Sequence, residues 1–123
     1  MNFKYSNNNK RYYTLDYFYK TKFNSKVFKI SLNAGFTCPH LKSGGCIYCS
    51  KLGSGEYAGN IKDDLIKQFN DGKEMIHKKW KDGKYIGYFQ ANTNTFAPVK
   101  TMATLHHVSH PMSNKIFSAF III

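Results

Sequence analysis

The chain has 123 residues, which suits one domain, and 42% of them are hydrophobic, enough for a modest core. Its formal net charge is +11. No apolar run approaches the roughly 20 residues that span a bilayer, and the first residues lack the apolar region of a secretory signal. All three cysteines lie within residues 38–49. An odd number of cysteines without a signal favours a reducing compartment, so we expect a cytoplasmic protein with no membrane partner.

The positive charge is uneven along the chain. Residues 1–55 carry nine Lys/Arg against one acidic residue, which gives +8, and residues 56–123 carry nine against six, which gives +3. A basic, aromatic-rich first half can attract a polyanion such as RNA. Lysines scattered without a motif also form the ordinary solvated surface of a basic protein. On charge alone, the solvated surface is the favoured interpretation.

The first half of the chain predicts a short helix, a strand and a loop. Residues 1–26 form a basic and aromatic extension, in which Thr14 can cap a helix over residues 15–23. Residues 27–32, VFKISL, have the β-branched and aromatic bias of a strand. A turn at residues 33–35 then leads into the cysteine loop, and glycine-rich residues 50–60 are expected to continue it.

A longer helix and a second strand follow. The spacing predicts a helix over residues 61–80, capped by Asn60, with Gly72 as a weak point in its middle. Its apolar stripe is formed by Ile61, Leu65, Phe69, Ile76 and Trp80. Residues 85–91, YIGYFQA, predict a strand that is buried on both faces. The order strand, loop, helix, strand predicts a βαβ unit of an α/β fold, with parallel strands.

The carboxyl ends of the two predicted strands carry the candidate site. The cysteine loop follows the first strand, and Gln90, Ala91, Asn92 and Thr93 follow the second. Sites in α/β folds gather at the carboxyl ends of parallel strands. We therefore expect the two segments to open onto the same face of the fold.

Cys38, Cys46 and Cys49 have the spacing C-x7-C-x2-C. The C-x2-C half lets two sulfurs reach one metal centre, and Gly44-Gly45 allows the third to fold back. Iron–sulfur proteins normally present four cysteines to a cubane cluster, so three would leave one iron open. Thiolates also suit zinc, and His40 would complete a Cys₃His set for a closed tetrahedral site. The spacing therefore leaves two alternatives: an iron–sulfur site, or a non-catalytic zinc module that binds nucleic acid.

Longer stretches of the chain carry a family resemblance over roughly residues 11–98. They are RYYTLDYFYKTKF, KVFKISLNAGFTCPH, GGCIYCSKLGSGEYAG and YFQANTNTFAP. Together they resemble the radical S-adenosylmethionine (radical SAM) superfamily, in its Elongator-like branch with the bacterial YhcC/YtqA group. The commonest superfamily spacing is C-x3-C-x2-C, and the x7 spacing here resembles the variant of that branch.

The resemblance implies cofactors, site residues and partners. Cys38, Cys46 and Cys49 would ligate a [4Fe–4S] cluster whose fourth iron is chelated by S-adenosylmethionine. Tyr48 would lie against the adenine of that cofactor. Gln90 and Ala91 would meet its methionine amino group, although the usual Gly-Gly-Glu is absent. The reduced cluster would cleave the sulfonium to give a 5′-deoxyadenosyl radical, with flavodoxin or ferredoxin as electron donor. The Elongator relationship implies transfer RNA or another RNA as substrate.

The length of the chain sets a limit on this expectation. A full TIM barrel takes about 250 residues, whereas two strands are predicted here. We therefore expect the N-terminal βαβ portion of a partial TIM-like radical SAM barrel, with its core over residues 27–98. Residues 99–123 lack acidic residues and end in an apolar run, and only residues 101–107 read weakly as helix. We expect this tail to be divergent, through truncation or a frameshift, and the chain to be too short for activity alone.

Overall fold

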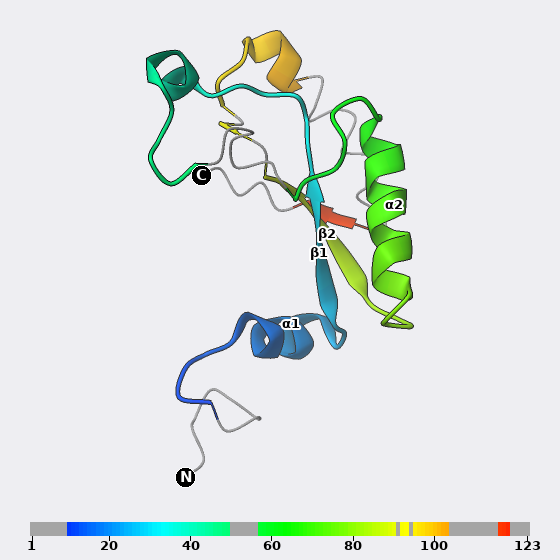
Figure 1. Cartoon of the computed structure of the whole chain (residues 1–123). Helices are drawn as coiled ribbons and strands as arrows, with labels where there is room; N and C mark the ends of the chain where they lie inside the picture. The colour runs from blue at the N-terminus through cyan, green and yellow to red at the C-terminus, as the bar shows by residue number, and fades with distance from the viewer. Residues whose placement is uncertain (1–9, 50–56, 91, 94, 104–115, 119–123) are drawn as a thin grey trace.

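The computed structural model describes residues 10–49, 57–90, 92, 93, 95–103 and 116–118, the last of these as backbone only. Its elements in chain order are helix α1 (Leu15–Phe23), strand β1 (Val27–Leu32), 3-10 helix η1 (Pro39–Ser43), helix α2 (Leu65–His77), strand β2 (Lys84–Phe89) and strand β3 (Ile116–Ser118). The backbone is also helical over residues 99–103, at the same end of the sheet as η1 (Figure 1). The expected loop over residues 50–60 lies outside the described residues at 50–56 and is non-helical at 57–60.

The three strands form one parallel sheet in the order β1-β2-β3. The register of β1 and β2 runs from Val27 opposite Lys84 to Leu32 opposite Phe89. This confirms the α/β class and the parallel βαβ unit. The expectation of only two strands was wrong, because residues 116–118 of the tail pair with β2. A three-residue strand is too short to produce a recognisable alternation in the sequence.

Helix α1 has the predicted bounds. The Thr14 hydroxyl accepts a hydrogen bond from the backbone N–H of Tyr17 at 3.1 Å, which satisfies one free donor of the first turn. Asn24 ends the helix in the left-handed region, with φ 47°. The helix lies beside the start of β1, at the opposite end of that strand from the cysteine loop (Figure 1). None of its residues is buried.

Helix α2 is shorter than the predicted span of 61–80. Its cap is Asp64, whose carboxylate accepts from the backbone N–H of Lys67 at 2.7 Å. The predicted cap, Asn60, instead accepts from the backbone N–H of Lys62 at 3.0 Å and closes a separate turn. An ionised carboxylate caps the positive end of a helix well, and here the helix begins at the later of two competing caps.

The revised bounds change the apolar stripe. Ile61 and Trp80 lie outside the helix and are 61% and 43% exposed, so their place in the stripe was wrong. Phe69 is buried in the core, and Leu65 and Ile76 pack against it, as predicted. Two contacts of His77 fix the C-terminal end of α2. The Tyr85 hydroxyl contacts its Nε2, and its Nδ1 lies 3.0 Å from the carbonyl oxygen of Trp80.

The hydrophobic core lies between α2 and one face of the sheet (Figure 1). It is formed by Ile30, Leu32, Phe69, Tyr85 and Phe89. Strand β2 ends at Phe89, two residues before the predicted end at 91, and residues 85–89 are all buried. Burial on both faces of the second strand is thereby confirmed. Strand β2, whose carboxyl end lies toward the cysteine loop, is therefore more buried than β1.

Gly72 lets α2 approach β1 closely. A Cβ atom at this position would lie 2.6 Å from Cγ2 of Ile30, which is 3% exposed. We expect Gly72→Ala to lower the free energy of unfolding by about 1–2 kcal/mol. Overpacking costs about 1–3 kcal/mol, and the better helix propensity of alanine returns at most about 1 kcal/mol. Urea unfolding followed by circular dichroism measures the difference.

Asn70→Ala is the matched control for this substitution. Asn70 is exposed on the same helix, so the change should alter the free energy of unfolding by less than about 0.5 kcal/mol. A Gly72→Ala protein as stable as the Asn70→Ala protein would contradict the close approach of α2 to β1.

Candidate functional site

The cysteine loop begins in a tight turn at the carboxyl end of β1. The backbone N–H of Gly35 donates to Oδ1 of Asn33 at 3.0 Å, and Gly35 has φ +77°, a conformation that favours glycine. Phe36 follows and is only 5% exposed. A buried aromatic residue therefore fixes the chain two positions before the first cysteine.

Gln68 on α2 contacts the start of this turn. It is the one buried polar side chain among the described residues, at 4% exposed. Its Oε1 accepts from the backbone N–H of Asn33 at 2.8 Å, and its Nε2 donates to the carbonyl oxygens of Asn33 and Asp63 at 3.0 and 2.9 Å. Gln68 was not predicted from the sequence as a site residue. The sequence feature that could have indicated it is a polar residue next to Phe69, on the apolar side of the helix.

The end of β2 is tied to the same loop, so the predicted convergence of the two strand ends is confirmed. The Asn92 side chain donates from Nδ2 to the carbonyl of Phe36 at 2.9 Å. A hydrogen bond from the Thr93 side chain, followed by backbone hydrogen bonds at His40 and Leu41, lowers the pKa of the Cys38 thiol. Cys38 therefore lies where the two segments meet.

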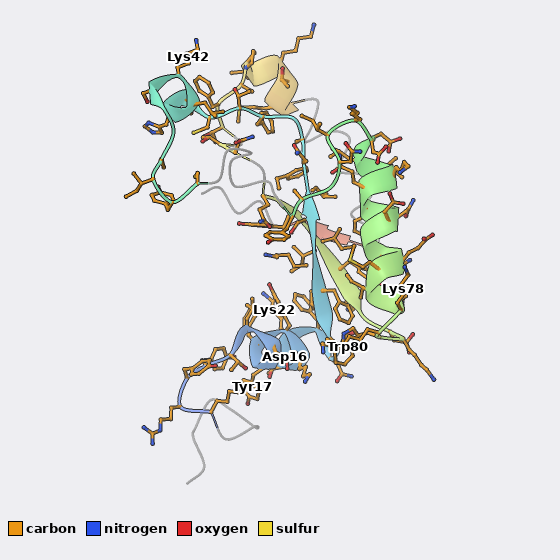
Figure 2. All side chains as sticks on the ribbon, in the orientation of Figure 1. Asp16, Tyr17, Lys22, Lys42, Lys78 and Trp80 are labelled. Atoms are coloured by element: carbon orange, nitrogen blue, oxygen red, sulfur yellow. The ribbon has the colours of Figure 1, made fainter. Side chains whose placement is uncertain are left out.

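The outer part of the loop is exposed and turns sharply at two glycines. Gly44 and Gly45 have φ +95° and +78°. The backbone N–H of Gly45 donates to the carbonyl of His40 at 2.9 Å, and that of Cys49 donates to the carbonyl of Cys46 at 3.0 Å. The second contact closes the C-x2-C segment into a turn. Figure 2 shows Lys42 on this outer part, far from Trp80, which packs against Phe28 near the start of β1.

The three thiols are free, and they are not gathered at one point. Cys38 and Cys46 are half-buried and Cys49 is exposed. Within the described part of the chain, which includes all three cysteines and His40, no three His, Cys, Asp or Glu side chains come close enough to hold a metal ion. The structure thus places the four predicted donors on one loop without bringing them together.

Tyr48 lies next to the cysteines, as its place in the sequence requires. Its side chain is 85% exposed. A hydrogen bond with Cys46 and the negative charge of the nearby thiolates, Cys46 first, raise the pKa of its hydroxyl. The ring is therefore accessible to a ligand that approaches the loop from solvent.

Gln90, which is predicted to meet the methionine amino group of S-adenosylmethionine, makes a side-chain contact at the end of β2. The Ser31 hydroxyl donates to Oε1 of Gln90 at 2.8 Å. Ser31 alternates along β1 with the core residues Ile30 and Leu32, so this pair lies on the sheet face opposite α2. Ala91 lies outside the described residues.

Two open pockets lie near the base of the loop. One, of about 350 Å³, is formed by the turn at residues 33–35 and the residues around the start of α2. The other, of about 300 Å³, runs between β1 and α2 past Gln68. Neither is lined by a cysteine, so neither pocket adjoins the sulfur atoms.

Three curated relatives are similar to most of this chain. Uncharacterized protein YtqA of Bacillus subtilis is 56% identical over 104 residues, which cover 81% of this chain and 32% of that protein. Uncharacterized protein MJ0486 of Methanocaldococcus jannaschii is 39% identical over 89 residues, covering 68% and 26%. Protein YhcC of Escherichia coli K12 is 28% identical over 100 residues, covering 76% and 30%. The chain thus spans about a third or less of each relative's length.

No family model matches the chain, and no match was found among solved structures. None of the relatives' names states an activity. Among the described residues, no helix has the length and apolar character needed to cross a membrane.

Proposed function

We propose that this chain is the N-terminal portion of a radical SAM protein of the Elongator-like branch. Cys38, Cys46 and Cys49 would hold a [4Fe–4S] cluster, with S-adenosylmethionine as the second cofactor. One observation carries the proposal: all three cysteines lie on one loop at the carboxyl end of β1, and that loop is tied to the end of β2. The sequence motifs of residues 11–98 add support that the cysteine spacing alone does not give.

The donor set fits such a cluster in chemistry and in number. Three thiols are the ligands that iron–sulfur clusters take, and one fewer than usual leaves an iron accessible. The base of the loop is fixed at Phe36 and Asn92, whereas the outer part turns at Gly44 and Gly45. A change of shape in the outer part, where glycine permits it, would bring Cys46 and Cys49 toward Cys38.

Three residues near the loop would contribute to cofactor binding in different ways. Cys38 would hold the cluster nearest the sheet, because it lies beside Thr93 at the end of β2. Tyr48 would offer an exposed ring for the adenine, since its side chain is 85% exposed. Gln90 would present the end of β2 on the face opposite α2, oriented by Ser31. When bound, the cluster supplies the electron for reductive cleavage of S-adenosylmethionine, as cofactors carry such chemistry.

The finer fold assignment is part of the same proposal. The strands follow one another in the sheet in chain order, as they do in a (β/α) barrel. We therefore interpret the described residues as the first part of a partial TIM-like barrel. Further strands would be needed for a complete cofactor pocket and a substrate wall, so we expect no turnover by this chain alone.

The proposed partners follow from charge and cofactor. The Elongator-like resemblance favours RNA, and transfer RNA in particular, as substrate, and the charge of +8 on residues 1–55, from nine Lys/Arg against one acidic residue, is compatible with such a polyanion. A flavodoxin or ferredoxin would supply the electron. Both partners are proposed for the whole protein. The relative from Bacillus subtilis is about three times as long as the region that matches this chain.

The alternative is a zinc module in which His40 is the fourth ligand. One observation favours it: His40 lies on the same loop as the cysteines, directly after Pro39 at the start of η1. A closed Cys₃His site would leave no position open for a small molecule. Such a module would bind nucleic acid without chemistry.

Reconstitution separates the two functions. The full chain is incubated with iron and sulfide under anaerobic conditions, and electron paramagnetic resonance of the reduced protein is recorded with and without S-adenosylmethionine. We expect a cubane signal that changes when S-adenosylmethionine is added. A colourless protein that retains one tightly bound zinc instead would overturn the proposal and favour the zinc module.

A further inference from the structure

A single side chain holds the start of the cysteine loop. Both hydrogens of the Gln68 amide are used, one on the carbonyl of Asn33 and one on the carbonyl of Asp63, and its oxygen accepts the Asn33 N–H. Asn33 is the first residue after β1. Because Gln68 is 4% exposed, water does not readily replace these contacts.

The same amide lies against the far end of the loop. The backbone N–H of Gly59 donates to the carbonyl of Ser31 at 3.1 Å, which returns the chain to the edge of β1. A Cβ atom on Gly59 would lie 2.2 Å from Oε1 of Gln68. The segment that carries all three cysteines therefore leaves and rejoins the fold on either side of one amide group.

We propose that Gln68 is a positioning residue for the cluster site. It acts through Asn33 and Gly59, setting the base from which the three cysteines reach a common centre, and it contacts no cofactor itself. This inference rests on the proposed function, because it presumes that the cysteines hold a cluster. Its physical basis is that a loop with a fixed base samples fewer arrangements of the three sulfur atoms. Cluster binding then costs less conformational entropy.

The test compares variants of the full chain that differ in whether they disturb this amide. Gln68→Met keeps the side-chain length and removes all three hydrogen bonds. Gly59→Ala retains Gln68 in the sequence but displaces its amide. Ile76→Ala is the matched control, since Ile76 packs against the core from the last turn of α2 and its side chain takes no part in the Gln68 hydrogen bonds. Each protein is reconstituted anaerobically with iron and sulfide.

The readout is the rate at which an iron chelator removes the cluster, compared with the thermal unfolding midpoint of the same protein. We expect Gln68→Met and Gly59→Ala to shorten cluster lifetime about 10-fold or more, the size typical of lost outer-shell contacts. Ile76→Ala should retain the wild-type lifetime although its midpoint falls. A purely structural role for Gln68 would instead make lifetime follow the midpoint in all three variants.

The outcomes keep the two proposals apart. A wild-type chain that takes up no cluster overturns the proposed function, and the role of Gln68 with it. A wild-type chain that holds a cluster, with Gln68→Met no more labile than Ile76→Ala, overturns only the role of Gln68. If Gln68→Met does not fold, the same comparison between Gly59→Ala and Ile76→Ala decides.

Discussion

We expect Cys46→Ala to abolish cluster uptake by the reconstituted chain, and His40→Ala to leave it at the wild-type level. Cys46 starts the C-x2-C turn that the Cys49 N–H closes at 3.0 Å. Its removal leaves two thiolates, too few to retain a cubane cluster against solvent. His40 has no place in a site built from three thiolates. Iron and sulfide content per chain, together with the visible absorption of the cluster, measures both variants.

The same pair of variants gives a different pattern for zinc, because only the result for His40→Ala changes. A Cys₃His site needs all four donors, so His40→Ala would then lose metal as fully as Cys46→Ala. Circular dichroism provides the control, because Cys46 lies outside the core and its substitution should leave the helical signal unchanged. Equal metal loss in both variants with an intact fold would contradict the cluster.

Local signals in the sequence predicted the parts of the fold that depend on neighbouring residues. Thr14 caps α1 because its hydroxyl reaches a backbone N–H three positions away, and the residue type and spacing alone indicate this contact. The helix start at Asp64 shows the limit of such signals. Asn60 and Asp64 are both good caps, and in the structure Asn60 closes a turn with Lys62 while Asp64 caps the helix.

Contacts between distant residues were less accessible from the sequence. The meeting of the two strand ends followed from topology, since parallel strands present their carboxyl ends together. The residues that make the contact did not follow: Asn92 reaches Phe36 and Gln68 reaches Asn33 across long stretches of chain. The cysteine spacing predicted the donor set, but it carries no information on how far apart the sulfurs lie.

Phe69→Ala is expected to have the largest effect on stability. Phe69 is 6% exposed and packs edge-on against Tyr85, with ring centroids 5.8 Å apart. It joins α2 to core residues of both β1 and β2, including Ile30 and Phe89. Truncation of a buried phenylalanine costs about 3–5 kcal/mol through lost burial and the cavity left behind. Small domains have about 5–15 kcal/mol in total, so we expect a far lower urea midpoint.

Phe69→Leu is the control, since it keeps an apolar side chain of similar volume and should cost less than about 1.5 kcal/mol. If Phe69→Ala unfolds at the same urea concentration as Phe69→Leu, α2 does not cover the sheet as described.

The comparison of Phe69→Ala with Cys46→Ala separates two causes of cluster loss. Phe69→Ala should also lose the proposed cluster, because α2, and with it Gln68, would no longer hold the loop base. Its helical signal should fall together with its iron content, whereas Cys46→Ala should lose iron alone.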